Sequence, residues 1–267
     1  MAPDGGLVTF STLLLDYGAE RATITLNRPD KRNAINPAMI AELQSALDDI
    51  EKKKVRVVII TGAGPAFCAG MDLDMLQAIG KQSPQENQED SRRMAKLFRR
   101  IWSFPRPLIA AVNGFALAGG CGIATLCDFT LSVPEACFGY TEVRIGFLPA
   151  IVSVFLTRQI GDKRARDLLL TGRKISAKEA QQLGLVSEIV EPDQLMSRAS
   201  ELADYLVEVS PGSLSRAKRL LVSAEQAGVD ADLERAVLEN ARIRCTPDFK
   251  EGIASFLEKR KPVWRDE

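Results

Sequence analysis

The sequence predicts an α/β fold built on a parallel sheet and followed by a helical C-terminal region. Residues 55–62 (VRVVIITG) and 107–114 (PLIAAVNG) are apolar runs typical of strands buried on both faces. Strand and helix signals alternate without a reversal up to about residue 130. From Val152 onward the signals are almost all helical. We therefore expect an α/β core over residues 1–195 and a helical region over residues 196–267.

The first elements are marked by their boundaries. Residues 21–27 (RATITLN) contain β-branched side chains at alternating positions and end at the turn RPD, which predicts a strand. Asn36 has the side chain of a helix N-cap, and Pro37 suits the first helical position. The apolar residues that follow at helical spacing are Met39, Ile40, Leu43, Ala46, Leu47 and Ile50.

The rest of the α/β part continues the alternation. Residues 85–104 predict a helix that ends before Pro105. After the strand at 107–114, residues 119–127 (GGCGIATLC) predict a short helix and residues 128–133 another strand. The helices expected in the C-terminal part cover residues 162–172, 176–184, 192–209, 211–226, 231–244 and 246–260.

Composition excludes several classes of function. The 35 basic and 35 acidic side chains balance, so we expect no attraction to nucleic acid or to an anionic membrane surface. The chain has no histidine, which removes Ser-His-Asp triads and the usual zinc and iron sites, and we expect no metal. Its five cysteines include no C-x-x-C pair and are interpreted as reduced thiols. With no basic, apolar leader at the N-terminus, the prediction is a cytoplasmic protein.

Two glycine-containing turns follow predicted strands. They are Ala69-Gly70-Met71-Asp72 and Ala118-Gly119-Gly120-Cys121, and the second leads directly into a helix. Free N–H groups at such turns can converge on one carbonyl oxygen and form an oxyanion hole. The alternative is that the glycines only permit tight turns and close packing. Neither turn matches G-x-G-x-x-G or a P-loop, so dinucleotide and nucleoside-triphosphate sites are poor interpretations.

A family resemblance decides between these alternatives. The segments ITLNRPDKRNAIN, VVIITGAGPAFCAGMDL, IAAVNGFALAGGCGIATLCDF and FGYTEVRIGFLPA resemble successive signature blocks of the crotonase (enoyl-CoA hydratase/isomerase) superfamily. The resemblance covers roughly residues 8–264. It implies a spiral of ββα repeats, a homotrimer or dimer of trimers built through the C-terminal helices, and an acyl-CoA thioester as substrate. CoA would then be part of the substrate, with no separate cofactor.

The resemblance also implies site residues. The N–H groups of Met71 and Gly119 would hold the thioester oxygen and stabilise an enolate. The positions that match the CoA contacts of the family are Lys31, Arg32, Ala34, Ala69, Met71, Asp72 and Leu73, with Phe256 and Lys259 offered by a neighbouring subunit.

The catalytic carboxylates depart from the usual pattern of the family. Hydratases of this family use two glutamates, and here the second is present as Glu142 while Gly122 stands at the position of the first. Asp74, Glu86 or Glu89 could replace the missing carboxylate, although each is more simply a surface charge. Phe98 is among the residues expected to line the acyl pocket.

Three functions remain open at this point. The first is a hydratase with Glu142 alone, favoured because FGYTEVRIGFLPAIVS is similar to bacterial enoyl-CoA and methylglutaconyl-CoA hydratase-like members. The second is a Δ3-Δ2-enoyl-CoA isomerase, since isomerases of the family often keep only this glutamate. The third is a non-catalytic acyl-CoA-binding or RNA-binding member. The lack of a basic stripe with aromatic residues argues against RNA.

Overall fold

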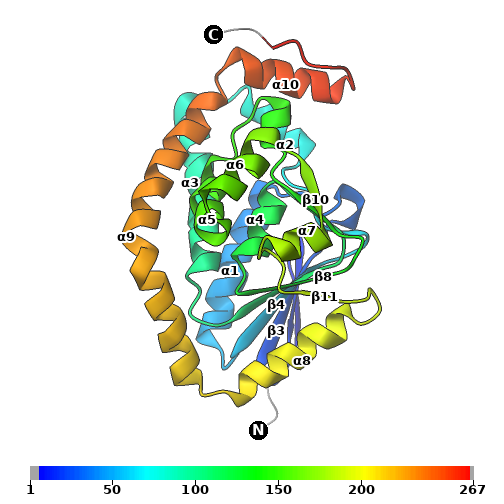
Figure 1. The fold of residues 1–267 in the computed structure, drawn as a ribbon, viewed down its shortest axis with the longest axis vertical. Helices are drawn as coiled ribbons and strands as arrows, with labels where there is room; N and C mark the ends of the chain where they lie inside the picture. The colour runs from blue at the N-terminus through cyan, green and yellow to red at the C-terminus, as the bar shows by residue number, and fades with distance from the viewer. Residues whose placement is uncertain (1–5, 265–267) are drawn as a thin grey trace.

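The computed structural model describes residues 6–264, and its strands form two sheets (Figure 1). The larger sheet has seven strands in the order β1-β2-β3-β4-β6-β8-β11, and the smaller has the order β10-β9-β7-β5. The strands are β1 Leu7–Thr9, β2 Leu13–Tyr17, β3 Arg21–Leu26, β4 Val57–Gly62, β5 Ala66–Cys68, β6 Leu108–Val112, β7 Phe115–Leu117, β8 Phe129–Ser132, β9 Cys137–Gly139, β10 Lys174–Ser176 and β11 Glu188–Ile189.

The helices enclose these sheets and extend beyond them. They are η1 Pro29–Lys31, α1 Pro37–Lys52, α2 Leu73–Ile79, α3 Pro84–Trp102, α4 Gly119–Leu126, η2 Glu142–Ile145, α5 Ala150–Ile160, α6 Asp162–Thr171, α7 Ala177–Gln182, α8 Leu195–Glu208, α9 Pro211–Ile243 and α10 Pro247–Leu257. In Figure 1, α9 runs along the length of the molecule, with α8 near one of its ends and α10 near the other.

The chain alternates between the two sheets as it advances. It passes from β4 to β5, from β6 to β7 and from β8 to β9, placing the first strand of each pair in the larger sheet and the second in the smaller. Helices follow each pair, so the chain forms the ββα repeats that the family resemblance implied. Neighbouring strands from β3 to β11 in the larger sheet are parallel, as predicted.

Three details correct the sequence-based prediction. Strands β1, β2 and β3 form an antiparallel meander, so the larger sheet is mixed. The short strands of the smaller sheet and β11 were not recognised because two or three residues are too few to show a period. The helices expected over residues 211–226 and 231–244 are one continuous helix, α9, because an internal Gly228 costs only about 1 kcal/mol.

The main core lies between the larger sheet and the helices. Helix α8 packs against β4 and β6, so the boundary expected at residue 195 falls where a sheet-covering helix begins. On α1, Asn36 caps the helix by accepting a hydrogen bond from the Met39 N–H at 2.8 Å, as predicted. A second apolar cluster joins α2 to α10 through Met75, Leu76, Phe147, Phe249 and Ile253.

Candidate active site

The two glycine turns lie side by side at one edge of the smaller sheet. They follow β5 and β7, which are parallel neighbours, so both turns leave the sheet at the same edge. Gly70 has φ 98°, and a Cβ there would lie 3.1 Å from Ala118 Cβ, which makes glycine the only residue that suits this position. The sequence therefore identified the turns correctly, although they follow β5 and β7 rather than the longer buried strands β4 and β6.

The Met71 N–H group is fixed by its neighbours. The Ile35 N–H donates to the Gly70 carbonyl at 2.7 Å, and the Asp72 N–H donates to the Ile35 carbonyl at 2.9 Å. These two bonds hold the peptide of Met71 between them. Within residues 6–264 the Met71 N–H has no protein acceptor of its own, so it can donate to a ligand.

The Gly119 N–H group stands at the first position of α4, where an N–H has no partner inside the helix. The turn before it is strained, because Ala118 has φ 49° and ψ −125°, a conformation that favours glycine. The Ala118 N–H donates to the Gly139 carbonyl at 2.7 Å, which ties the turn to the end of β9. A Cβ on Gly120 would lie 2.4 Å from the Cys68 carbonyl oxygen, so the second glycine lets α4 pack directly on β5.

Glu142 follows Gly139, whose carbonyl accepts the Ala118 N–H, by three residues. Its carboxylate lies near enough to Cys121 of α4 to add to burial in raising the pKa of that thiol. Glu142 is buried, at 8% exposure, and its Oε2 atom has no hydrogen-bond partner in the described part of the chain. Burial raises the pKa of Glu142 to about 7. A carboxyl group with this pKa can both accept and donate a proton near neutral pH.

The titratable neighbours of Glu142 are Cys121 and Tyr140. Burial raises the pKa of Cys121 to about 12 and that of Tyr140 well above 10, so both are neutral when Glu142 titrates. The Tyr140 hydroxyl is 3.1 Å from the Thr125 hydroxyl, and the two share a hydrogen bond. The environment of Glu142 is therefore apolar or neutral, which accounts for the direction of its pKa shift.

The position of the missing carboxylate is filled. A Cβ on Gly122 would lie 2.7 Å from Phe98 Cε2 and 2.8 Å from Val152 Cγ1. No side chain fits there without displacing one of these apolar groups. The Phe98 ring also reaches the start of α4, because a Cβ on Gly119 would lie 3.9 Å from Phe98 Cζ.

None of the alternative carboxylates replaces the missing glutamate. Asp74 is exposed and forms an ion pair with Lys31, with 3.3 Å between Nζ and Oδ2. Glu86 closes the capping box at the start of α3 by accepting from the Ser83 N–H at 2.7 Å. Glu89 is exposed on the surface of α3. Of these four carboxylates, only Glu142 is buried.

Most of the expected CoA-binding residues are brought together. The segment with Lys31, Arg32 and Ala34 runs beside the Met71 turn, and the Ala69 N–H donates to the Arg32 carbonyl at 3.0 Å. The side chains of Lys31, Arg32 and Leu73 are exposed along this edge. They form a surface on which an extended ligand could lie next to the two glycine turns.

Asp72 is engaged within the protein. Its carboxylate is 2.6 Å from Arg28 Nη2, and it accepts a hydrogen bond from the Asp74 N–H at the start of α2. Burial alone would raise the pKa of Asp72, but these partners lower it. Arg28 also donates to the Ala34 carbonyl at 2.5 Å, so it fastens both segments beside Met71. Arg28 was not among the predicted site residues, although it lies in the NRPD turn.

Phe256 and Lys259 lie at the far end of the chain. Phe256 belongs to α10 and is half exposed, and the exposed Lys259 follows the helix with φ 53°. Helix α10 packs against η2 of its own chain. Through the second apolar cluster, which includes Phe249 and Met75, α10 also packs on α2, which follows the Met71 turn. The part of Phe256 and Lys259 in a neighbouring subunit's site stays a prediction.

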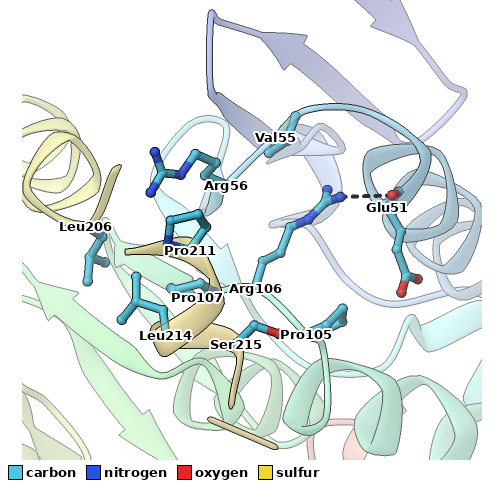
Figure 2. Close-up of a pocket in the computed structure, with 10 residues that line it drawn as sticks. All are labelled: Glu51, Val55, Arg56, Pro105, Arg106, Pro107, Leu206, Pro211, Leu214 and Ser215. Carbon is cyan, nitrogen blue, oxygen red and sulfur yellow. Dashed lines mark hydrogen bonds between the residues drawn. The ribbon is translucent and has the colours of Figure 1, made fainter. Parts of the chain in front are cut away.

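A cavity of about 300 Å³ lies away from this constellation. Its lining includes Arg56, Arg106 and Pro211, which lie before β4, before β6 and at the start of α9 (Figure 2). It therefore adjoins the amino ends of β4 and β6. The Arg106 guanidinium donates to the Glu51 carbonyl at 2.8 Å, so it ties the end of α1 in place. None of the predicted site residues lines this cavity.

Residues 6–264 contain no cluster of three or more metal-binding side chains. No helix in the described chain is long and apolar enough to cross a membrane.

Comparison with known proteins identifies the family. The family model described as enoyl-CoA hydratase/isomerase matches residues 18–267. The chain belongs to this family. A Thermus thermophilus protein provisionally named enoyl-CoA hydratase is 45% identical over 242 residues, covering 90% of this chain and 96% of the relative. A crotonyl-CoA hydratase of Syntrophomonas wolfei is 36% identical, covering 95% and 98%.

Solved structures of the enoyl-CoA hydratase/isomerase family share the fold. The crystal structure of an enoyl-CoA hydratase/isomerase from Xanthobacter autotrophicus Py2 is similar with a TM-score of 0.87 and 32% identity, covering 94% of each chain. The α/β spiral with a helical C-terminal region is therefore confirmed as the fold of this family.

Proposed function

We propose that the protein is an enoyl-CoA hydratase that works with one catalytic glutamate, Glu142. The observation that carries the proposal is a buried carboxylate with a pKa of about 7 and an unpartnered oxygen, next to two free N–H groups on adjoining turns. The names of the two sequence relatives, both hydratases, support the same activity.

In the proposed reaction, water adds across the C2=C3 bond of a 2-enoyl thioester. Glu142 takes a proton from water while the water oxygen bonds to C3, and the π electrons move onto the thioester oxygen as an enolate. The N–H groups of Met71 and Gly119 stabilise that oxygen, and one such donor is worth roughly 3–4 kcal/mol of barrier. Glu142 then returns the proton to C2, which restores its ionised form and yields a 3-hydroxyacyl thioester.

One observation favours the isomerase as a second candidate. The side of α4 at Gly122 is covered by Phe98 and Val152, so it offers water no polar partner. A single carboxyl group that moves a proton between C2 and C4 of an enoyl thioester needs no water. The two activities use the same oxyanion hole and the same glutamate, and substrate choice separates them.

The remaining parts of the proposal concern binding and assembly. CoA would extend from the Met71 turn along Lys31 and Arg32, with no separate cofactor. Exposed Leu220 and Leu221 on the first half of α9, at 71% and 75%, support assembly into a trimer or a dimer of trimers through this region. We propose that the enzyme acts in the cytoplasm.

The test is a paired assay with 2-enoyl-CoA and 3-enoyl-CoA, run on the protein and on Glu142→Gln. Loss of the conjugated-thioester absorbance with crotonyl-CoA, abolished in the variant, would establish the hydratase. Conversion of 3-enoyl-CoA to 2-enoyl-CoA without water addition would establish the isomerase instead. Glu89→Gln removes an exposed carboxylate from α3 and is the control. Binding of acyl-CoA without turnover of either substrate would reject both activities.

A further inference from the structure

A buried polar cluster lies between α3 and α9, behind the proposed active site. The Arg244 guanidinium is 2.8 Å from Asp90 Oδ2, and both side chains are at most 3% exposed. Arg244 also donates to Asn240 Oδ1 at 2.9 Å, and the Ser91 hydroxyl donates to the same oxygen at 2.8 Å. Asn240 is therefore held from two sides.

The cluster reaches the proposed catalytic residue through one segment. Asn240 Nδ2 donates to the Leu148 carbonyl at 3.2 Å, and the Arg244 guanidinium lies 5.5 Å from the centre of the Phe147 ring. The Phe147 N–H in turn donates to the Glu142 carbonyl at 3.0 Å. A continuous chain of contacts thus runs from Asn240 through residues 147 and 148 to the backbone of Glu142.

Helix α10 holds the other side of the same segment. A Cβ on Gly252 would lie 2.1 Å from the Ile145 carbonyl oxygen, so α10 packs backbone to backbone on η2. The rings of Phe147 and Phe249 are 5.3 Å apart between centroids. The segment after Glu142 therefore lies between an apolar contact from α10 and a polar contact from Asn240.

We propose that Asn240, held by Arg244 and Ser91, is a positioning residue that keeps the segment after Glu142 closed over the catalytic carboxylate. A buried ion pair often stabilises a protein no more than apolar side chains of similar volume would. Stability alone therefore does not account for the directed hydrogen bonds of this cluster. Here the hydrogen bonds aim one amide at the Leu148 carbonyl. Loss of that bond would let residues 147 and 148 move and admit water to Glu142. The inference rests on the proposed role of Glu142 as the proton carrier.

The test compares Asn240→Ala with Ser91→Ala. Both remove a hydrogen bond inside the cluster, but only Asn240→Ala removes the bond to Leu148. We expect Asn240→Ala to lower kcat by tenfold to a hundredfold with little change in KM, since a small misplacement of a catalytic group has effects of about this size. Ser91→Ala should stay within about twofold, because Arg244 still donates to Asn240 Oδ1 and the bond from Asn240 to Leu148 remains.

The pKa of Glu142 supplies a readout that does not depend on turnover. The difference in unfolding stability between each protein and its Glu142→Gln partner, followed against pH, locates this pKa. We expect the value of about 7 to fall by at least one unit, towards its ordinary value of 4.5, in Asn240→Ala and to stay in place in Ser91→Ala. No charged neighbour contributes to the shift among the described residues, so a lower value would report hydration.

Either outcome decides the inference. A folded Asn240→Ala protein that keeps the original pKa and kcat would overturn it. If Asn240→Ala does not fold, Asn240→Asp gives the same readouts, because it keeps the acceptor for Arg244 and Ser91 and loses the donor to Leu148. If the original protein turns over neither enoyl-CoA, the proposed function fails while the pKa comparison still decides the role of Asn240.

Discussion

Glu142 lies near α4 and Gly122 lies in it, and their surroundings are built in opposite ways. Around Glu142 the protein leaves a carboxylate buried, with one oxygen unpartnered and its pKa raised to about 7. Around Gly122 the side chains of Phe98 and Val152 occupy the space that any side chain would need. The comparison shows that more than the carboxylate is missing at position 122. Apolar side chains also fill the space that a glutamate side chain would need. Of these two positions, only Glu142 offers a group that can carry a proton.

Removing the carboxylate at 142 is the strongest challenge to this comparison. Glu142→Gln keeps the shape of the side chain and removes its ability to carry a proton. We expect kcat to fall by about 10²–10⁴-fold, the usual contribution of a general acid or base, in a steady-state assay with enoyl-CoA. Retention of full activity would show that another group carries the proton.

The same variant should change the pH dependence of stability. A carboxyl group whose pKa is raised from 4.5 to about 7 in the folded protein favours folding below pH 4.5, and this contribution is lost as pH rises through 7. The loss amounts to about 3 kcal/mol. Glu142→Gln should therefore be more stable than the original protein at pH 8 by about that amount relative to pH 4. Urea unfolding at the two pH values measures the effect, and equal differences would contradict the burial of an ionisable carboxyl.

Adding a side chain at position 122 tests whether Phe98 and Val152 fill the space beside Gly122. Gly122→Ala would push its Cβ into Phe98 and Val152, and we expect a loss of about 1–3 kcal/mol in unfolding free energy. Combining it with Val152→Ala should recover part of that loss, so the two effects should not add. Gly212→Ala on α9, where a Cβ would meet nothing within 4 Å, is the matched control and should not destabilise. Strict additivity at 122 and 152 would show that the space is open.

The smallest expected change in unfolding free energy comes from the turn at Ala118. Ala118→Gly should raise the unfolding free energy by about 1 kcal/mol, because glycine relieves the strain of φ 49°. The same substitution at the exposed helical Ala217 should lower it by about 1 kcal/mol. Thermal unfolding of the two variants compares the signs directly, and two losses would argue against strain at Ala118.

Local signals were sufficient for the long elements and for the turns. The continuous runs of β4 and β6, the Asn36 cap and the glycines at the start of α4 each have a short-range physical cause that a sequence displays. Short strands such as β5 and β10 lack that signal, since pairing with distant strands stabilises them. Their recognition requires the tertiary fold.

The candidate site was predictable where the family motif covers it. Glu142, Met71 and Gly119 were predicted as site residues through the motif, and their roles stay predictions. The structure brings the turns that carry Met71 and Gly119 side by side. The sequence could not show that Phe98 from α3 and Val152 from α5 meet at Gly122, because three separate segments converge there. The ion pair between Asp72 and Arg28 could not be predicted for the same reason. It depends on the tertiary packing that brings the NRPD turn next to the Met71 turn.

The backbone contact between α10 and η2 has a consequence for the order of synthesis. Gly252 lies far downstream of Glu142, and its close approach to Ile145 packs α10 on η2, the segment that begins with Glu142. A ribosome releases Glu142 long before it releases α10. A nascent chain can therefore complete both sheets while η2 still lacks the packing that the last helix supplies.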